Sequence, residues 1–204
     1  MKQRMEASTT SRRPGGRSAR VRAAVIAATL EELAAHGYSG LSLDSVATRA
    51  EVHRTSIYRR WRTKEMLVLD AMLEQAAETV AVPDTGSLRG DLLELAQRSA
   101  AIQTSPAGEA VVRAVAGEAP GNPELAAANA RFWAERLELD RTIVERARGR
   151  GEIGPRADPG PAIEALLGPL YFRLLVTGEP LDPGFIEGIV DLVLAGCLWS
   201  GRSR

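Results

Sequence analysis

Residues 41–64 read LSLDSVATRAEVHRTSIYRRWRTK, which is the pattern of two short helices joined by a tight turn. Ser42 is a suitable N-cap for the first helix, because its hydroxyl can accept hydrogen bonds from the backbone amides of the first turn. The turn falls at residues 50–52, and the second helix then places Ile57 and Trp61 on one inward face at i, i+4 spacing. This pattern predicts a helix-turn-helix.

The outward side of the second helix carries side chains that suit contact with DNA. Arginine, threonine and tyrosine can hydrogen-bond base edges, and hydroxyl or cationic groups can bind phosphate oxygens. A helix with an apolar side behind and such side chains in front is typical of recognition helices that enter the major groove. We therefore predict base contacts from Arg54, Thr55 and Tyr58. Phosphate contacts are predicted for Ser42, Ser56, Arg59, Arg60 and Lys64.

The charge distribution separates a basic head from an acidic body. The formal net charge is zero, but residues 1–64 hold 13 Lys and Arg against 5 Asp and Glu, whereas residues 65–204 hold 13 against 21. Positive charge gathered beside a helix-turn-helix is expected of a protein that binds nucleic acid. We therefore divide the chain into residues 17–64, a DNA-binding domain, and residues 65–204, a second domain.

Residues 1–16 form a polar, basic segment without helical periodicity. Such a composition cannot bury enough apolar surface to order itself, so a disordered tail is expected. The alternative is a basic arm that reaches into an adjacent minor groove. The sequence leaves both interpretations open.

Composition and helix-start signals together predict an all-α chain of about nine helices. Ala, Leu, Arg and Glu dominate over β-branched and aromatic residues, which favours helix over strand. Ser, Asn or Asp directly before Pro, an N-cap followed by the first helical position, recurs at 105–106, 122–123, 158–159 and 182–183. With Ser87 as a fifth cap, these signals predict body helices at 88–103, 106–118, 123–148, 159–177 and 183–199. Two further helices are predicted around the motif, from Ser18 to Ala35 with Gly37 after its end, and from Thr63 to Val82.

Several classes of protein are disfavoured by what the sequence contains. One cysteine, Cys197, cannot form an intrachain disulfide, and no signal peptide or long apolar run is present, so we expect a cytoplasmic protein without membrane contact. The two histidines, His36 and His53, both lie in the head, which disfavours a His-based catalytic or metal site in the body. We predict no catalytic residues, no metal site and no cofactor.

The chain resembles the tetracycline repressor (TetR) family of transcriptional regulators. In residues 17–67 the likeness rests on His36-Gly37-Tyr38, on Ser42-x-x-x-Val46-Ala47 and on Ile57-Tyr58-x-x-Trp61-x-x-Lys64-Glu65. In the body it rests on residues 86–92, 122–125 and 167–171, which look like the C-terminal domain of one TetR subgroup. Two departures stand in the motif, since Glu51 replaces the usual turn glycine and His53 replaces the usual small capping residue.

The last two predicted helices are apolar nearly all round, and such helices must be buried nearly all round. The resemblance implies that they form a four-helix contact with a second subunit; a larger intrachain core is the alternative. Residues predicted in this dimer interface are Ile163, Leu167, Leu170, Leu174, Ile186, Val190, Val193 and Cys197.

The body also carries a set of aromatic and sulfur side chains on three predicted helices, namely Met72, Phe132, Trp133, Tyr171 and Phe172. Most aromatic side chains on amphipathic helices belong to the core. The functional alternative is a mostly apolar ligand pocket with Trp or Tyr as polar handle. The resemblance implies a bound inducer, so we predict a pocket for an unidentified small-molecule effector.

Together these observations predict a homodimeric, ligand-responsive transcriptional regulator, a repressor that binds a palindromic operator. Residues 65–204 are then the ligand-binding and dimerisation domain. Two alternatives remain open from the sequence: a DNA-binding dimer without any small ligand, and a helical enzyme that carries a basic head.

Overall fold

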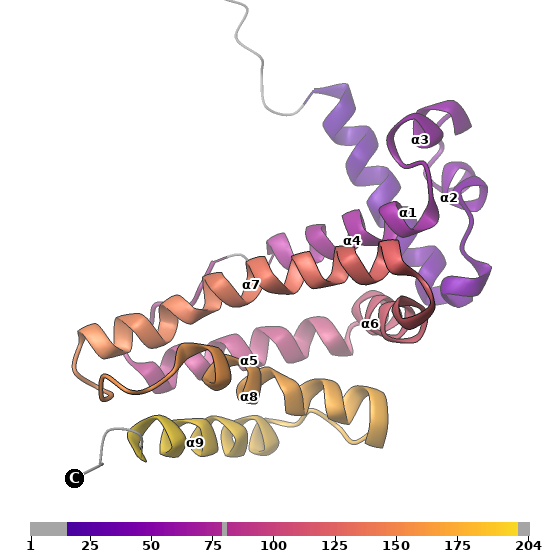
Figure 1. Ribbon diagram of the computed structural model, residues 1–204. Helices are drawn as coiled ribbons and strands as arrows, with labels where there is room; N and C mark the ends of the chain where they lie inside the picture. The colour runs from indigo at the N-terminus through magenta and orange to yellow at the C-terminus, as the bar shows by residue number, and fades with distance from the viewer. Residues whose placement is uncertain (1–15, 79–80, 200–204) are drawn as a thin grey trace, which may run out of the picture.

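The computed structural model describes residues 16–78 and 81–199, and within them the chain is helical with no strand (Figure 1). The all-α prediction is thereby confirmed. The described α-helices are α1 (Arg17–Gly40), α2 (Leu43–Arg49), α3 (Arg54–Arg60), α4 (Lys64–Glu78), α5 (Leu88–Thr104), α6 (Pro106–Glu118), α7 (Pro123–Gly149), α8 (Pro159–Phe172) and α9 (Pro183–Trp199). A 3-10 turn, η1 (Ala119–Gly121), precedes α7, and a π-helix, η2 (Arg173–Thr177), continues α8.

Side-chain caps explain why the body helices begin where they do. Ser105 accepts from the amide of Gly108 at 3.0 Å, and Asn122 accepts from the amide of Leu125 at 3.1 Å. The same arrangement starts three further helices, where the capping residues are Ser87, Asp158 and Asp182. The predicted helix starts are confirmed. They could be predicted because N-capping is a local interaction between residues close together in the sequence.

The two turns of the head use backbone that favours glycine. Gly37 interrupts α1 with φ of 65° and ψ of −177°, an extended conformation at positive φ that is open almost only to glycine. Glu51, in the corner between α2 and α3, also has a positive φ, 52°. A side chain there brings Cβ close to the backbone, which costs roughly 1–2 kcal/mol. Glu51 therefore strains the turn in which TetR-like sequences usually carry glycine.

Glu51→Gly is expected to stabilise the head by about 1 kcal/mol, because relief of left-handed strain exceeds the added flexibility of glycine in the unfolded chain. Urea unfolding followed by circular dichroism measures the change. Glu51→Asn is the control, since asparagine tolerates the left-handed region and should recover part of the gain. Equal or lower stability of the glycine variant would show that the turn is unstrained.

Two apolar clusters hold the molecule together. The first joins the inner faces of α1–α4 to Val111, Ala114 and Val115 of α6 and to Leu125 of α7. The second lies between α5, the C-terminal half of α7, α8 and α9. The head therefore packs directly on α6, and Figure 1 shows α8 and α9 side by side at the far side of the body from α2 and α3.

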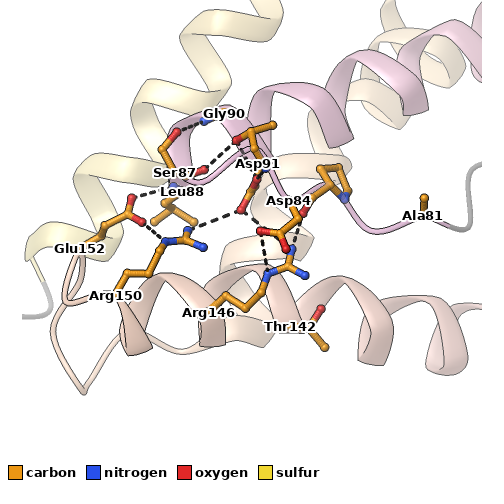
Figure 2. Close-up of polar contacts among 12 residues, drawn as sticks. Ala81, Asp84, Ser87, Leu88, Gly90, Asp91, Thr142, Arg146, Arg150 and Glu152 are labelled. Carbon is orange, nitrogen blue, oxygen red and sulfur yellow. Dashed lines mark hydrogen bonds and ion pairs between the residues drawn. The ribbon is translucent and has the colours of Figure 1, made fainter.

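A polar network fixes the start of α5 against the end of α7 (Figure 2). The carboxylate of Asp91 is fully buried and accepts from the Thr85 amide at 2.6 Å and from its hydroxyl at 2.8 Å. Arg146 of α7 and Arg150, directly after α7, reach the same carboxylate at 3.9 and 3.5 Å. Glu152 then accepts from the Leu88 amide at 2.7 Å. These contacts anchor the segment that links α4 to the body.

Three regions lie outside the described residues: 1–15, 79–80 and 200–204. The predicted tail, residues 1–16, falls almost wholly in the first of them and stays a prediction. The helix predicted to reach Val82 is described to Glu78, and residues 81–82 are not helical. Among the described helices none is long and apolar enough to cross a membrane.

Candidate DNA interface and ligand cavity

The recognition helix α3 is held from behind by two buried side chains. Ile57 is fully buried, and Trp61, which follows the last turn, is buried as well. The indole nitrogen of Trp61 donates to Asp70 of α4 at 2.9 Å, and Arg22 of α1 donates to the same carboxylate at 2.7 and 3.1 Å. This triangle of α1, α3 and α4 sets the orientation of the outward face of α3.

The predicted DNA contacts lie on α3 and at the cap of α2, except for Lys64, which begins α4. Arg54, Thr55 and Tyr58 are exposed on α3, and so are Arg59 and Arg60. Ser42 is also exposed, with its hydroxyl capping α2 through the amide of Ser45 at 3.0 Å. Ser56 and Lys64 are half-buried. The exposed cationic and hydroxyl groups can contact DNA without rearrangement of the backbone.

Asp44 organises the two side chains most suited to reading bases. Its carboxylate pairs with the Arg54 guanidinium and accepts from the Tyr58 hydroxyl at 3.3 Å. These contacts depend on how α2 and α3 cross, so spacing along the chain does not predict them. A carboxylate behind a guanidinium restricts the side-chain rotamers and so prepares Arg54 for a directed contact.

Lys64 is engaged within the protein. Its ammonium group donates to the Tyr38 carbonyl at 3.3 Å and lies 4.0 Å from the centre of the Tyr38 ring. The neighbouring Glu65 accepts from the Tyr38 hydroxyl at 2.6 Å and from the side-chain amide of Asn122 at 3.1 Å. The start of α4 is thus tied to the head on one side and to the start of α7 on the other.

The body holds a mostly apolar cavity of about 220 Å³, partly open to solvent, between α4, α5, α6, α7 and α8. Trp133 of α7 forms an aromatic wall, with ring centres 5.2 Å from Phe132 and 5.5 Å from Tyr171, both in edge-to-face geometry. Ile102 and Val112 are among its aliphatic walls. A concave apolar site with aromatic walls is the usual form of a small-molecule site.

Four of the predicted pocket residues line this cavity: Met72, Phe132, Trp133 and Tyr171. Phe172 was wrongly included, because it is absent from the lining and 56% exposed. Consecutive residues of a helix point about 100° apart, so Tyr171 and Phe172 cannot face the same cavity.

The polar end of the cavity was not identified from the sequence. Arg136 and Asp140, one turn apart on α7, form a buried bidentate pair with distances of 2.9 and 2.7 Å. Burial raises the pKa of Asp140, although the guanidinium beside it acts in the opposite direction. Gln103 of α5 and Asn129 of α7 add amide groups to the lining. Charged residues at i, i+4 are usually a solvated surface pair, so spacing alone could not reveal these groups.

Three side chains belong to both the cavity and the packing of the head. Val111 and Val115 of α6 line the cavity and are buried in the apolar cluster of α1–α4. Met72 of α4 lines the cavity and packs against the same cluster. A molecule in the cavity therefore presses on side chains that position α1 and α4.

The predicted dimer residues are mostly interior to the subunit, which corrects the prediction. Ile163, Leu170 and Val190 are fully buried, and Leu167 lines the cavity. The remaining ones are the buried Ile186, Val193 and Cys197 and the half-buried Leu174. All of them except Leu174 belong to the apolar cluster of α5, α7, α8 and α9, so these seven have little or no surface left for a second subunit.

The opposite stripe of α8, η2 and α9 is apolar and exposed. Leu192 is 75% exposed and Val176 is 68% exposed, and Phe172 lies in the same stripe. Gly168 and Gly188 are exposed there too, and a Cβ added to either would meet no atom within 4 Å. Glycine inside a helix costs about 1 kcal/mol relative to alanine, and packing within the subunit gives no reason for it here.

The chain is similar to known transcriptional regulators over most of its length. Residues 25–71 match the family described as bacterial regulatory proteins, tetR family, and residues 82–193 match the tetracyclin repressor-like, C-terminal domain. The HTH-type transcriptional regulator AqdR of Rhodococcus erythropolis is 31% identical over 180 residues, 88% of this chain and 86% of AqdR. The DNA-binding transcriptional repressor TetR of Mycobacteroides abscessus is 34% identical over 177 residues, 84% of this chain and 90% of that protein. The crystal structure of TetR family transcription regulator SCO0332 has a TM-score of 0.72 and 33% identity, and the match covers 87% of this chain and 98% of that chain.

Proposed function

This chain belongs to the TetR family of DNA-binding transcriptional regulators, and on that premise we propose that it is a homodimeric repressor whose palindromic operator is released when a small effector binds the cavity. The observation that carries the proposal is the position of α6. Its Val111 and Val115 form a wall of the cavity and part of the head core at once. An effector can therefore shift the heads by the contacts it makes in the body.

In this proposal α3 enters the major groove of a half-site. Arg54, Thr55 and Tyr58 read base edges, with Asp44 holding Arg54 and Tyr58 in place. Ser42, Ser56, Arg59 and Arg60 bind phosphates on either side, and Lys64 adds positive charge near them. The residues 17–64 act as the DNA-binding domain, and residues 65–204 bind the effector and the second subunit.

The two subunits meet through the exposed stripe of α8 and α9. Leu192, Val176 and Phe172 would be covered by the same residues of the partner, as a two-fold axis requires. Gly168 and Gly188 would let the helices of the two subunits approach closely. Dimerisation places two copies of α3 at a fixed separation, and a palindromic operator matches that symmetry.

Release follows from two states of the dimer. In one state the cavity is empty and the separation of the α3 helices fits two half-sites. In the other an effector displaces α6 and Met72 of α4, so the heads tilt and the separation no longer fits. Both helices contact the head, through the apolar cluster and through Glu65 in the first turn of α4.

Arg54→Ala is expected to weaken operator binding by about 1–3 kcal/mol and to relax the preference at one base pair of each half-site, because it removes a base contact. Arg59→Ala is the matched control on the same helix. It should weaken operator and scrambled DNA alike and reduce the salt dependence of log K by about one phosphate contact. Fluorescence anisotropy with both DNAs at several salt concentrations measures these effects. Equal losses of Arg54→Ala on both DNAs would remove Arg54 from the base-reading residues.

The proposed release is tested by measuring coupling in both directions. A compound that binds the cavity should lower operator affinity by about 5–150-fold, and operator should lower the affinity for that compound by the same factor. Calorimetry with and without saturating operator measures how operator changes the affinity for the compound. Anisotropy of labelled operator, with and without the compound, measures how the compound changes the affinity for operator. A compound that fills the cavity and leaves operator affinity unchanged would contradict effector release, since equal affinity for both states shifts nothing.

A further inference from the structure

The amide of Gln103 is the least satisfied polar group of the cavity. Gln103 lines the cavity and is 2% exposed, and its side-chain oxygen, Oε1, has no hydrogen-bond partner. Tyr171, which also lines the cavity, lies beside it, and the Gln103 side chain acts to lower the pKa of the tyrosine hydroxyl. Buried acceptors are almost always paired, because an unpaired one has lost water without replacement. The free oxygen therefore marks the place of a donor that the protein itself does not supply.

The lining offers no unmatched charge. Its ionisable side chains are Arg136, Asp140 and Tyr171. The first two are paired with each other through two hydrogen bonds. Burial raises the pKa of Tyr171 to about 12, so its hydroxyl stays neutral at physiological pH. A charged ligand would lose its hydration here without gaining an opposite charge, which is strongly unfavourable.

Size and wall chemistry limit the ligand further. The cavity holds about 220 Å³, and an apolar cavity of about 150 Å³ is enough for benzene. Trp133 and Tyr171 lie nearly at right angles, at 81°, so a flat ring can stack on one and meet the edge of the other.

We infer that the cavity selects a neutral, mostly apolar molecule of one or two rings that carries a hydroxyl or N–H donor, and that Gln103 Oε1 accepts that donor. The inference rests on the proposed function only in taking this cavity as the effector site. Asn129 lines the same cavity and is half-buried, so it is the matched amide with which Gln103 is compared.

Three probes of similar size test this choice: 2-naphthol, which is neutral with a donor, 2-fluoronaphthalene, which is neutral without a donor, and 2-naphthoate, which is an anion. In calorimetry on the full chain, 2-naphthol should bind about tenfold more tightly than 2-fluoronaphthalene, and 2-naphthoate more weakly than 2-naphthol. Gln103→Leu should remove the tenfold preference, and Asn129→Leu should retain it. The ratio of two affinities within one variant is insensitive to a general loosening of the cavity.

Several results would overturn the inference. These are equal binding of 2-naphthol and 2-fluoronaphthalene by the unaltered chain, a preference that survives Gln103→Leu, tightest binding of 2-naphthoate, or no binding of any probe. Operator affinity is measured on the same samples. If 2-naphthol binds with the expected preference but leaves operator affinity unchanged, the chemistry of the cavity stands and effector release fails. If the preference is absent while operator binding is intact, the inference fails and the DNA-binding proposal stands.

Discussion

Leu192→Glu is expected to convert the dimer into monomers and to lower operator affinity by at least about 100-fold, because each monomer then binds a single half-site without the avidity of two linked heads. Leu192 is 75% exposed in the subunit, so the substitution leaves the fold intact. In the proposed dimer two new carboxylates would be buried close to a symmetry axis, which is costly without partners. Light scattering and operator anisotropy measure the two effects.

Leu139→Glu is the matched control. Leu139 is an exposed leucine of α7, 46% accessible, and lies on a helix outside the stripe of α8 and α9. This variant should remain dimeric and keep its operator affinity. If Leu192→Glu also remains dimeric at micromolar concentration, the contact between subunits does not use this stripe.

Arg136→Ala is expected to lower the free energy of unfolding by about 3–5 kcal/mol, since it leaves the fully buried carboxylate of Asp140 without its guanidinium. Burial already raises the pKa of Asp140, and loss of the arginine should raise that pKa further, so the variant takes up a proton near this site. The loss of stability should therefore be smaller at pH 5 than at pH 8, because protonation removes the unpaired charge. Urea unfolding at both pH values measures it.

Two comparisons separate this effect from ordinary loss of an ion pair. Glu109→Ala breaks the exposed pair with Arg113, whose atoms are 2.8 Å apart, and should cost less than about 1 kcal/mol. Combining Arg136→Met with Asp140→Leu replaces both charges by apolar groups and should recover most of the stability. A single Arg136→Ala variant as stable as the parent would show that water reaches the pair.

The helix boundaries were predictable because their causes are local. In Ser105-Pro106 and in Asn122-Pro123, the first residue is a preferred N-cap and the proline is a preferred first helical residue. In the structure α6 begins at Pro106 and α7 at Pro123, as these pairs predict. The helix-turn-helix was predictable for the same reason. The sequence also showed Glu51 where a glycine is usual, but its positive φ was found only in the structure. Local interactions of this kind do not depend on the rest of the fold.

The two faces of α9 could not be told apart from the sequence. Val190 is fully buried and Leu192 is 75% exposed, yet both belong to a helix that is apolar almost all round. Periodicity identifies an apolar face only where the opposite face is polar. The residues predicted for the dimer interface therefore lie on the side of the helix that packs against α5 and α7. The structure was needed to identify the exposed side of the helix.

The polar end of the cavity was hidden for a related reason. Gln103 and Tyr171 lie on different helices, and their meeting depends on how α5 and α8 cross. The pair between Asp44 of α2 and Arg54 of α3 depends on the crossing of two helices in the same way. Contacts between helices are set by tertiary packing, and no spacing along the chain reports them.

Selection of bound sequences from random duplex DNA tests the central claim most directly, because it returns base preference and symmetry in one measurement. The account predicts an inverted repeat whose half-sites are related by a two-fold axis, with their centres about one helical turn apart or a multiple of it. Selection with Arg54→Ala should return the same repeat with one position per half-site relaxed. Enrichment of a single asymmetric site, or of no sequence at all, would contradict a dimer that reads its operator through α3.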